Sequence, residues 1–176
     1  MEFDLKESIK ILARTPAVLN KLLLDLSPAW THQNEGENTW SAYDIIGHLI
    51  HGEKTDWIPR TEIILRREGD KTFVPFDRFA QFENSKGQTL EELLKTFTQL
   101  RAENLQKLDA LKLTEQDLLK TGTHPELGTV TLKQLIATWT IHDLSHIHQM
   151  TRVMVKLYGD QIGPWKAYSG ILRNTI

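Results

Sequence analysis

Two histidines, His142 and His146, stand four residues apart in the segment WTIHDLSHIHQM, among apolar residues that recur with helical spacing. At about 100° per residue, such side chains lie about 40° apart on one helical face. Their imidazoles can therefore reach one metal ion. An isolated pair at this spacing is more often two unrelated core-edge histidines satisfied by hydrogen bonds, so the pair needs further support.

The apolar stripe of this segment indicates which way the side chains of the histidines point. It places His142 at the edge of the predicted core face and His146 within that face. His148 points about 120° away from His142 and is expected to face solvent. The residues of the stripe are Leu135, Ile136, Trp139, Ile147, Met150, Val153, Met154 and Leu157.

A third histidine, His48, comes from the distant segment WSAYDIIGHLIHGEKTDW. It adjoins the apolar positions Ile45 and Leu49 and is therefore predicted at the core edge of its own helix. Three imidazoles from two helices would leave one coordination position open, which is typical of a catalytic rather than a structural metal site. His51 is a rival ligand, but it lies further from the apolar side, so the pattern favours His48.

The sequence contains no cysteine, so a thiolate ligand and a cysteine nucleophile are excluded. Any metal must then be held by nitrogen and oxygen atoms. Imidazole suits zinc, nickel, copper and iron. We expect a divalent ion, with zinc and nickel as the first candidates.

Other polar residues near the histidines have two interpretations each. Asp143 could orient a ligand imidazole, or it could be a buried bridging acid. Gln149 could bind substrate or a metal-bound water, or it could join two helices by a hydrogen bond. Glu53 lies about 140° from His48 and is expected on a charged helix face.

The elements that must position these residues are helices, because helical periodicity dominates and strand-like alternation is nearly absent. Pro16 is expected to kink the first helix or to divide it, with Thr15 as the N-cap of the second part. Pro59 is expected to kink or divide the second helix. The four long segments cover residues 4–26, 41–67, 89–111 and 131–158. They predict an all-α four-helix bundle as a single domain over residues 1–176.

A long loop, residues 68–87, and a tail from residue 159 are expected to pack on this bundle. The loop carries four aromatic residues, Phe73, Phe76, Phe79 and Phe82. Four further residues could line a pocket mouth or form satellite core: Asp77, Arg78, Trp165 and Tyr168.

Composition places the chain among ordinary globular proteins. It has 176 residues, of which 40% are hydrophobic and 25% charged, and a net charge of −2. That balance gives no electrostatic reason for binding nucleic acid or an anionic membrane. The N-terminus lacks the pattern of a signal peptide, so a cytoplasmic protein is expected. No glycine-rich phosphate loop and no G-x-S-x-G element occurs.

The segments TWSAYDIIGHLIHGEKTDW and HDLSHIHQM, with LGTVTLKQLIATWTIHDLSHIHQ leading into the last helix, resemble the DinB and YfiT-like superfamily. The resemblance covers essentially the whole chain. It implies a four-helix bundle with a metal bound by His48, His142 and His146, in agreement with the helical-face argument. It implies no single reaction, because some members are thiol transferases, some are isomerases and many have no assigned reaction.

These observations favour a metal-dependent enzyme that hydrolyses a small molecule, with the catalytic residues beyond the metal unassigned. The first alternative is an S-transferase that uses a low-molecular-weight thiol such as bacillithiol. Others are a non-catalytic metal-binding stress protein with a closed site, and a helical interaction module with incidental histidines. A homodimer is compatible with the sequence, although no feature specifies it.

Overall fold

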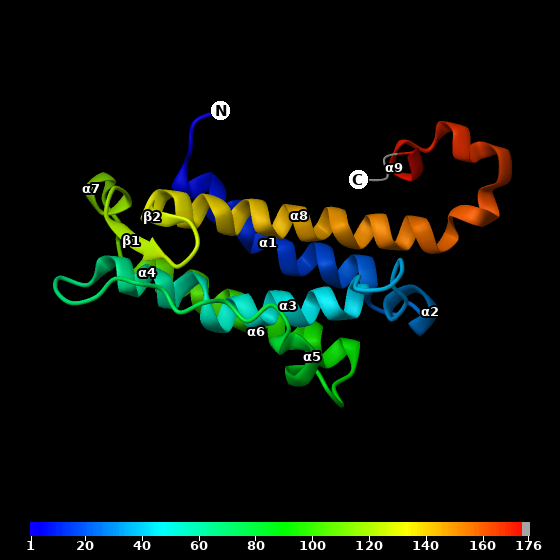
Figure 1. Ribbon diagram of the computed structural model, residues 1–176, viewed down its shortest axis with the longest axis horizontal. Coiled ribbons are helices and arrows are strands. Elements are labelled where there is room, and N and C mark those ends of the chain that lie inside the picture. Colours follow the sequence, from blue (N-terminus) through cyan, green and yellow to red (C-terminus); the bar gives the residue numbers. More distant parts are fainter. Residues whose placement is uncertain (174–176) are drawn as a thin grey trace.

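The computed structural model describes residues 1–173 of the chain and consists mainly of four long helical segments (Figure 1). These are α1 (Leu5–Leu23), α3 (Ala42–Thr55) continued by α4 (Trp57–Leu65), α6 (Leu90–Ala110) and α8 (Leu132–Tyr158). The shorter elements are α2 (Pro28–Thr31), α5 (Ala80–Asn84), α7 (Glu115–Leu118), β1 (Thr121–His124), β2 (Gly128–Thr131), η1 (Gly159–Tyr168) and α9 (Gly170–Arg173). None of the described helices is long and apolar enough to cross a membrane. The predicted all-α four-helix bundle is confirmed.

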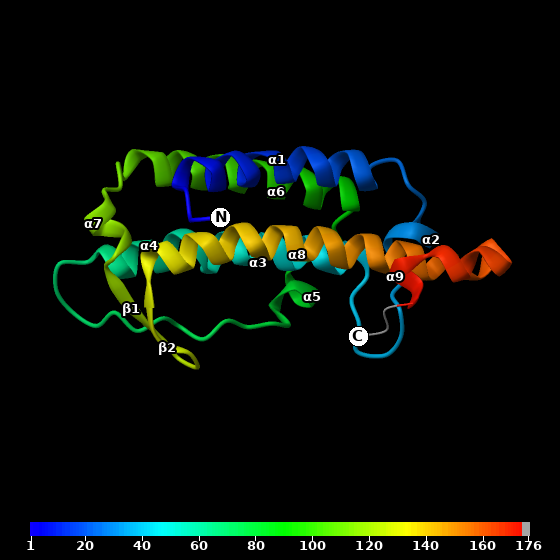
Figure 2. The same cartoon turned by 90° about the horizontal axis from the view of Figure 1, so that it is seen from above.

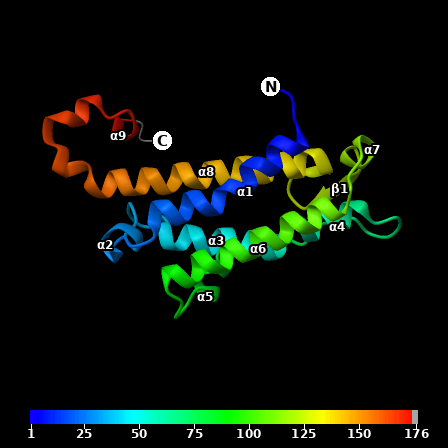
Figure 3. The ribbon, with the colours of Figure 1, turned by 180° about the vertical axis from the view of Figure 1, so that it is seen from behind.

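The bundle has an order in space that differs from its order in sequence. Helix α1 packs on α6 and α8, and α3 packs on the same two helices. Helices α1 and α8 run in one direction and α3 and α6 in the other (Figures 1 and 3). Because α3 and α6 are parallel, the chain must return along the bundle between them, and Figure 2 shows residues 66–79 doing so. The parallel arrangement therefore accounts for the long loop.

Three of the long helices begin where the sequence predicts, at Ser41, Thr89 and Thr131. Each forms a capping box with the residue three positions later. At the first of them, the Ser41 hydroxyl accepts from the Asp44 N–H at 3.1 Å, and the Asp44 carboxylate accepts from the Ser41 N–H at 2.9 Å. The caps at Ser41 and Thr131 fix the starts of α3 and α8, the helices that carry the three histidines.

The two interior prolines behave differently. Pro59 lies in the first turn of α4, just after the break at Asp56, so the expected division of the second segment is confirmed. Pro16 lies inside an unbroken α1, so the expected division into two helices with Thr15 as an N-cap is wrong. The Pro16 ring frees the carbonyl of Leu12, which accepts instead from Arg101 Nη1 at 2.8 Å. A guanidinium from another helix thus replaces the missing backbone bond.

A small antiparallel hairpin, β1 and β2, precedes α8 and was not expected. Its four-residue strands, TGTH and GTVT, are too short and polar to show a strand period. The long loop joins its edge, because the Phe73 N–H donates to the Thr123 carbonyl and the Thr123 N–H donates to the Lys71 carbonyl, both at 2.9 Å. Loop and hairpin lie on the side of α3 and α8 that faces away from α1 and α6 (Figure 2).

Both halves of the long loop pack on the bundle, since α5 contacts α3, but only two of its four aromatic residues take part. Phe73 is buried and Phe76 is half-buried, whereas Phe79 and Phe82 are exposed, so the expectation holds for two of the four aromatic residues.

The C-terminal tail docks on the end of α8 through η1 and α9. Leu172 lies against Gly159, where an added Cβ would meet the leucine side chain at 3.0 Å. Trp165 and Tyr168 are exposed by 71% and 82%, so their expected packing or pocket role is wrong. The last part of the predicted tail, residues 174–176, lies outside the described residues.

Candidate metal centre

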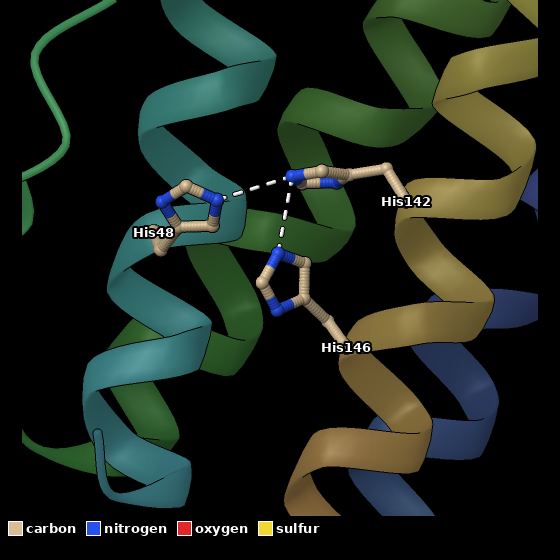
Figure 4. Close-up of side chains that lie close together, drawn as sticks. All are labelled: His48, His142 and His146. Atoms are coloured by element: carbon tan, nitrogen blue, oxygen red, sulfur yellow. Dashed lines mark hydrogen bonds between the residues drawn. The ribbon is translucent and has the colours of Figure 1, made fainter. Parts of the chain in front are cut away.

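The Nε2 atoms of His48, His142 and His146 converge between α3 and α8 (Figure 4). His142 Nε2 lies 3.1 Å from His48 Nε2 and 3.1 Å from His146 Nε2. The three nitrogens all lie within 4.8 Å of one another. Two successive turns of α8 supply His142 and His146, and α3 supplies His48 from the opposite side, as the helical faces predict.

The close contacts between the rings cannot all be hydrogen bonds. The Nδ1–H of His146 donates to Gln149 Oε1 at 2.8 Å, which leaves Nε2 of the neutral ring as an acceptor. His142 Nε2 can then donate to His146 or accept from His48, but it cannot do both. The cluster therefore presents surplus lone pairs at its centre.

Burial keeps the imidazoles neutral. It lowers the pKa of His48 to about 3 and of His142 to about 2, and the other rings of the cluster add to both shifts. Burial also lowers the pKa of His146, although the hydrogen bond to Gln149 opposes this shift. At neutral pH the lone pairs of all three rings are available to a ligand.

Aromatic side chains surround the histidine cluster. Trp40 lies 4.8 Å from the ring of His48, Phe76 stands edge-on to it at 5.4 Å, and Trp57 stands edge-on to His142 at 5.1 Å. Such walls exclude water and lower the local dielectric constant, which strengthens the attraction of the lone pairs for a cation.

The donor set fits a divalent metal ion. Ligand distances of about 2.0–2.1 Å in a tetrahedral site put two imidazole nitrogens about 3.3 Å apart, close to the 3.1 Å of the two contacts. The Nδ1 atoms of His48 and His142 are buried without a hydrogen-bond partner among the described residues. No carboxylate or further histidine of the described residues joins the cluster, so three candidate ligand atoms converge here.

A cavity of about 480 Å³ opens from the cluster along the seam between α8 and the α3–α4 segment. The loop contributes Phe73, Pro75, Phe76 and Arg78 to its wall, and the hairpin contributes residues from His124 to Val130. Arg78 thus lines the cavity as expected, whereas Asp77 is exposed and does not line it. A small molecule has room beside the three nitrogens.

The other histidines of these two helices lie outside the cluster. His51 packs against Phe76 at 4.8 Å, and His148 is exposed. The choice of His48 over His51 and the outward direction of His148 agree with the structure. Gln149 contacts a ring of the cluster from the same helix, so the alternative of a bond between two helices is wrong.

Glu53 is buried, although the sequence predicts it on an exposed helix face. It points away from His48 as expected, but it is 2% exposed, so its expected place on a charged helix face is wrong. Its carboxylate accepts from Arg101 Nη2 at 2.8 Å, from Asn104 Nδ2 at 3.0 Å and from Trp139 Nε1 at 3.1 Å. Burial raises the pKa of Glu53, and the charge of Arg101 opposes this.

Asp143 belongs to the same group, which we call the ionic cluster: Glu53, Arg101, Asn104, Trp139 and Asp143. Arg101 binds both oxygens of Asp143, at 2.5 and 3.0 Å. Asp143 is thus a buried bridging acid, and no hydrogen bond joins it to a ligand imidazole. Sequence reasoning missed Arg101 and Asn104, although both continue the apolar stripe of Leu93, Phe97 and Leu108 along α6.

Comparisons with known proteins agree with this architecture. The pattern that defines the DinB superfamily matches residues 11–150. A solved structure, YfiT from Bacillus subtilis, superposes with a TM-score of 0.73 at 19% identity, over 89% of this chain and 87% of that one. YfiT is described as "a probable metal-dependent hydrolase with an unusual four-helix bundle topology". Among curated proteins, none matches. With most of its length matched by the family pattern, the chain belongs to the DinB superfamily.

Proposed function

We propose that this protein is a metal-dependent hydrolase of a small molecule, and that His48, His142 and His146 hold its divalent ion. The observation that carries the proposal is the convergence of three neutral Nε2 atoms at one end of a cavity. The description of YfiT as a probable metal-dependent hydrolase supports the same reaction class.

The chain's own residues would hold and shape this site. Gln149 fixes the tautomer of His146, so that its Nε2 faces the ion. The rings of Trp40, Trp57 and Phe76 keep bulk water from the imidazoles. When bound, the ion supplies Lewis acidity, which polarises a substrate oxygen and lowers the pKa of a water ligand.

An open coordination position favours catalysis over simple metal storage. A closed structural site has four protein ligands, whereas three ligand atoms converge here and the cavity adjoins them. The non-catalytic alternative predicts a further protein ligand, and the described residues offer none within the cluster.

The S-transferase alternative uses the same three histidines and differs in the reacting partner. An external thiol would bind the ion as a thiolate and attack an electrophile. The absence of cysteine from the sequence is compatible with both reactions, because the thiol would be a co-substrate. The experiment below therefore measures both reactions.

The test begins with metal content. Protein purified without a histidine tag should carry about one equivalent of zinc or nickel by elemental analysis, and the double variant His142→Ala/His146→Ala should carry less than about a tenth of that. The matched control is His148→Ala, which removes an exposed histidine from the same helix and should leave the metal content unchanged. A double variant that keeps a full equivalent would refute the site.

Activity is then measured with the metal-loaded wild type. Hydrolysis of activated esters and amides should fall at least about 100-fold on chelation and return with the metal. Activity only with a thiol and an electrophile such as chlorodinitrobenzene would replace the hydrolase by the S-transferase. A metal that binds without supporting either reaction would favour the non-catalytic alternative.

A further inference from the structure

The cavity has a second polar group of residues, at the end away from the histidines. On the α3–α4 side, His48, Gly52, Asp56 and Arg60 follow one another at intervals of four residues and all line the cavity. On the α8 side, a matching series with the same interval lines the opposite wall: His146, His142, Thr138 and Gln134. Eight residues separate His48 from Asp56, which corresponds to about 12 Å along a helix.

Because of this distance, the two ends of the cavity must have different roles. Asp56 is too far from the three Nε2 atoms to exchange a proton with a group bound there, because such transfer needs hydrogen-bond distance. Between the two ends the wall includes Gly52, against which the Trp57 indole lies, and Thr138. Because one cavity of about 480 Å³ reaches both the histidines and Asp56, an extended molecule has room to span them.

Donors and an acceptor meet at this far end. Arg60 Nη2 lies 2.8 Å from Asp56 Oδ1, and the two side chains are only 9% and 13% exposed. The same nitrogen also makes a long contact of 3.5 Å with the Val74 carbonyl. The other two guanidinium nitrogens, Nη1 and Nε, form no hydrogen bond among the described residues. The second oxygen of Asp56 is likewise free for a ligand.

His124 adds a second donor. Its Nδ1 accepts from the N–H groups of Glu126 and Leu127 at 3.1 and 3.2 Å, so the neutral ring carries its proton on Nε2. Phe73 holds both donors in place, with the Arg60 guanidinium 5.1 Å above its ring and His124 edge-on at 6.3 Å. Burial and the charge of Arg60 lower the pKa of His124, which keeps this ring neutral.

The positive charge at this end already has a negative partner, and Glu126 adds a further acid at the rim. Asp56 neutralises Arg60, so a carboxylate or phosphate would meet a buried negative charge next to its binding partner. An uncharged amide meets no such repulsion. Its carbonyl can accept from Arg60 and His124, and its N–H can donate to Asp56.

We propose that Asp56, Arg60 and His124 form a specificity site for an uncharged amide group at the distal end of the substrate. The inference rests on the proposed function, since it assumes that the other end of the same molecule reacts at the histidine cluster. It identifies the substrate class as extended molecules with an amide about 10 Å from the reacting group.

The test uses straight-chain alkyl hydroxamates of graded length, because a hydroxamate binds divalent metals directly. Each chain ends in a carboxamide, a carboxylate or a methyl group, and calorimetry with untagged, metal-loaded protein gives the dissociation constants. At the best length the carboxamide should bind about 10-fold more tightly than the methyl compound. Equal binding of the carboxamide and methyl compounds at every length, or tighter binding of the carboxylate, would overturn the inference.

Variants sharpen the result. Asp56→Asn removes the buried negative charge with almost no change in shape, so it should tighten the carboxylate compound about 10-fold and weaken the carboxamide. Arg60→Met should abolish the preference for the carboxamide, and the wild-type series stands by itself if this variant does not fold. Glu62→Gln removes an exposed acid of α4 that does not line the cavity, and it should change neither preference.

The two proposals fail in distinguishable ways. If the hydroxamates bind only in the presence of metal but ignore their end groups, the specificity site is refuted and the metal site stands. If no hydroxamate binds metal-loaded protein, the open coordination position itself is refuted, and the specificity site falls with the function on which it rests.

Discussion

Helices α3 and α8 each carry polar residues of two buried clusters that have opposite properties. In the ionic cluster, Glu53 and Asp143 occupy their hydrogen-bonding capacity on Arg101, Asn104 and Trp139. In the histidine cluster, three neutral Nε2 atoms face one another, and the Nδ1 atoms of His48 and His142 have no hydrogen-bond partner within residues 1–173. Asp143 belongs to the first cluster and its neighbour His142 to the second.

The difference teaches how to separate structural from functional polar groups in one core. Arg101 donates to two acids and to the Leu12 carbonyl that Pro16 leaves free, so the ionic cluster joins α1, α3, α6 and α8. Its acids need no further ligand, and the one buried side-chain atom of the cluster that has no hydrogen-bond partner among the described residues is Nε of Arg101. Its guanidinium lies between the rings of Phe97 and Trp139, which belong to the two apolar clusters of the core. The histidine cluster is not satisfied in this way, because its three Nε2 atoms face one another and cannot all form hydrogen bonds.

The largest expected effect comes from removing the cation of the ionic cluster. Arg101→Met leaves two buried carboxylates and the Leu12 carbonyl without their donor, so the free energy of unfolding should fall by about 3–5 kcal/mol. Urea denaturation followed by circular dichroism measures this. Arg14→Met, at an exposed position of α1, is the control and should change stability by less than about 0.5 kcal/mol. A loss as small as that of the control would mean that the ionic cluster does not hold the bundle together.

Acid should destabilise the metal-free protein through the histidine cluster rather than through the ionic cluster. In the metal-free protein, His48 and His142 stay neutral down to about pH 3 and about pH 2, whereas both bind protons near pH 6.5 in the unfolded chain. The unfolded state therefore binds more protons below pH 6.5, and stability is lost as the pH falls. Between about pH 7.5 and about pH 5.5 the free energy of unfolding should fall by about 3 kcal/mol.

Denaturation of chelator-treated protein at both pH values measures this loss. The double variant His48→Gln/His142→Gln should lose most of the pH dependence, and the exposed control His148→Gln should retain it. A double variant that is as acid-sensitive as the wild type would assign the effect to other groups.

The smallest effect concerns the orientation of one ring. Gln149→Leu removes the acceptor that fixes the tautomer of His146, so metal affinity should fall about 10-fold while the stability of the metal-free protein changes little. Competition with a chromophoric chelator measures the affinity. Gln161→Leu, at an exposed position of η1, should have no effect. Unchanged affinity of Gln149→Leu would show that the backbone alone orients the ring.

Much of the candidate site could be predicted because it depends on helical periodicity. The four-residue spacing of His142 and His146, and the apolar neighbours of His48, specify which faces meet when the helices pack. The same reasoning failed for Glu53, because its acidic type suggested solvent although its position continues the stripe of Ile46, Leu49 and Ile50. A charged residue on an apolar stripe predicts a buried partner, and Arg101 on α6 was that partner.

The sequence by itself determined the helices, their capping residues and the three histidines, since these depend on neighbours within a few turns. Only the tertiary structure decided which groups are satisfied and which converge, because that depends on atoms from helices about 40 to 90 residues apart in the chain, such as Arg101 with Asp143 and His48 with His142. The hairpin and the far end of the cavity were likewise decided by packing. The far end of the cavity is built from residues of α4 and the long loop together with β1, which is distant from them in the sequence. Short polar segments have no hydrophobic period, so the sequence does not reveal such contacts.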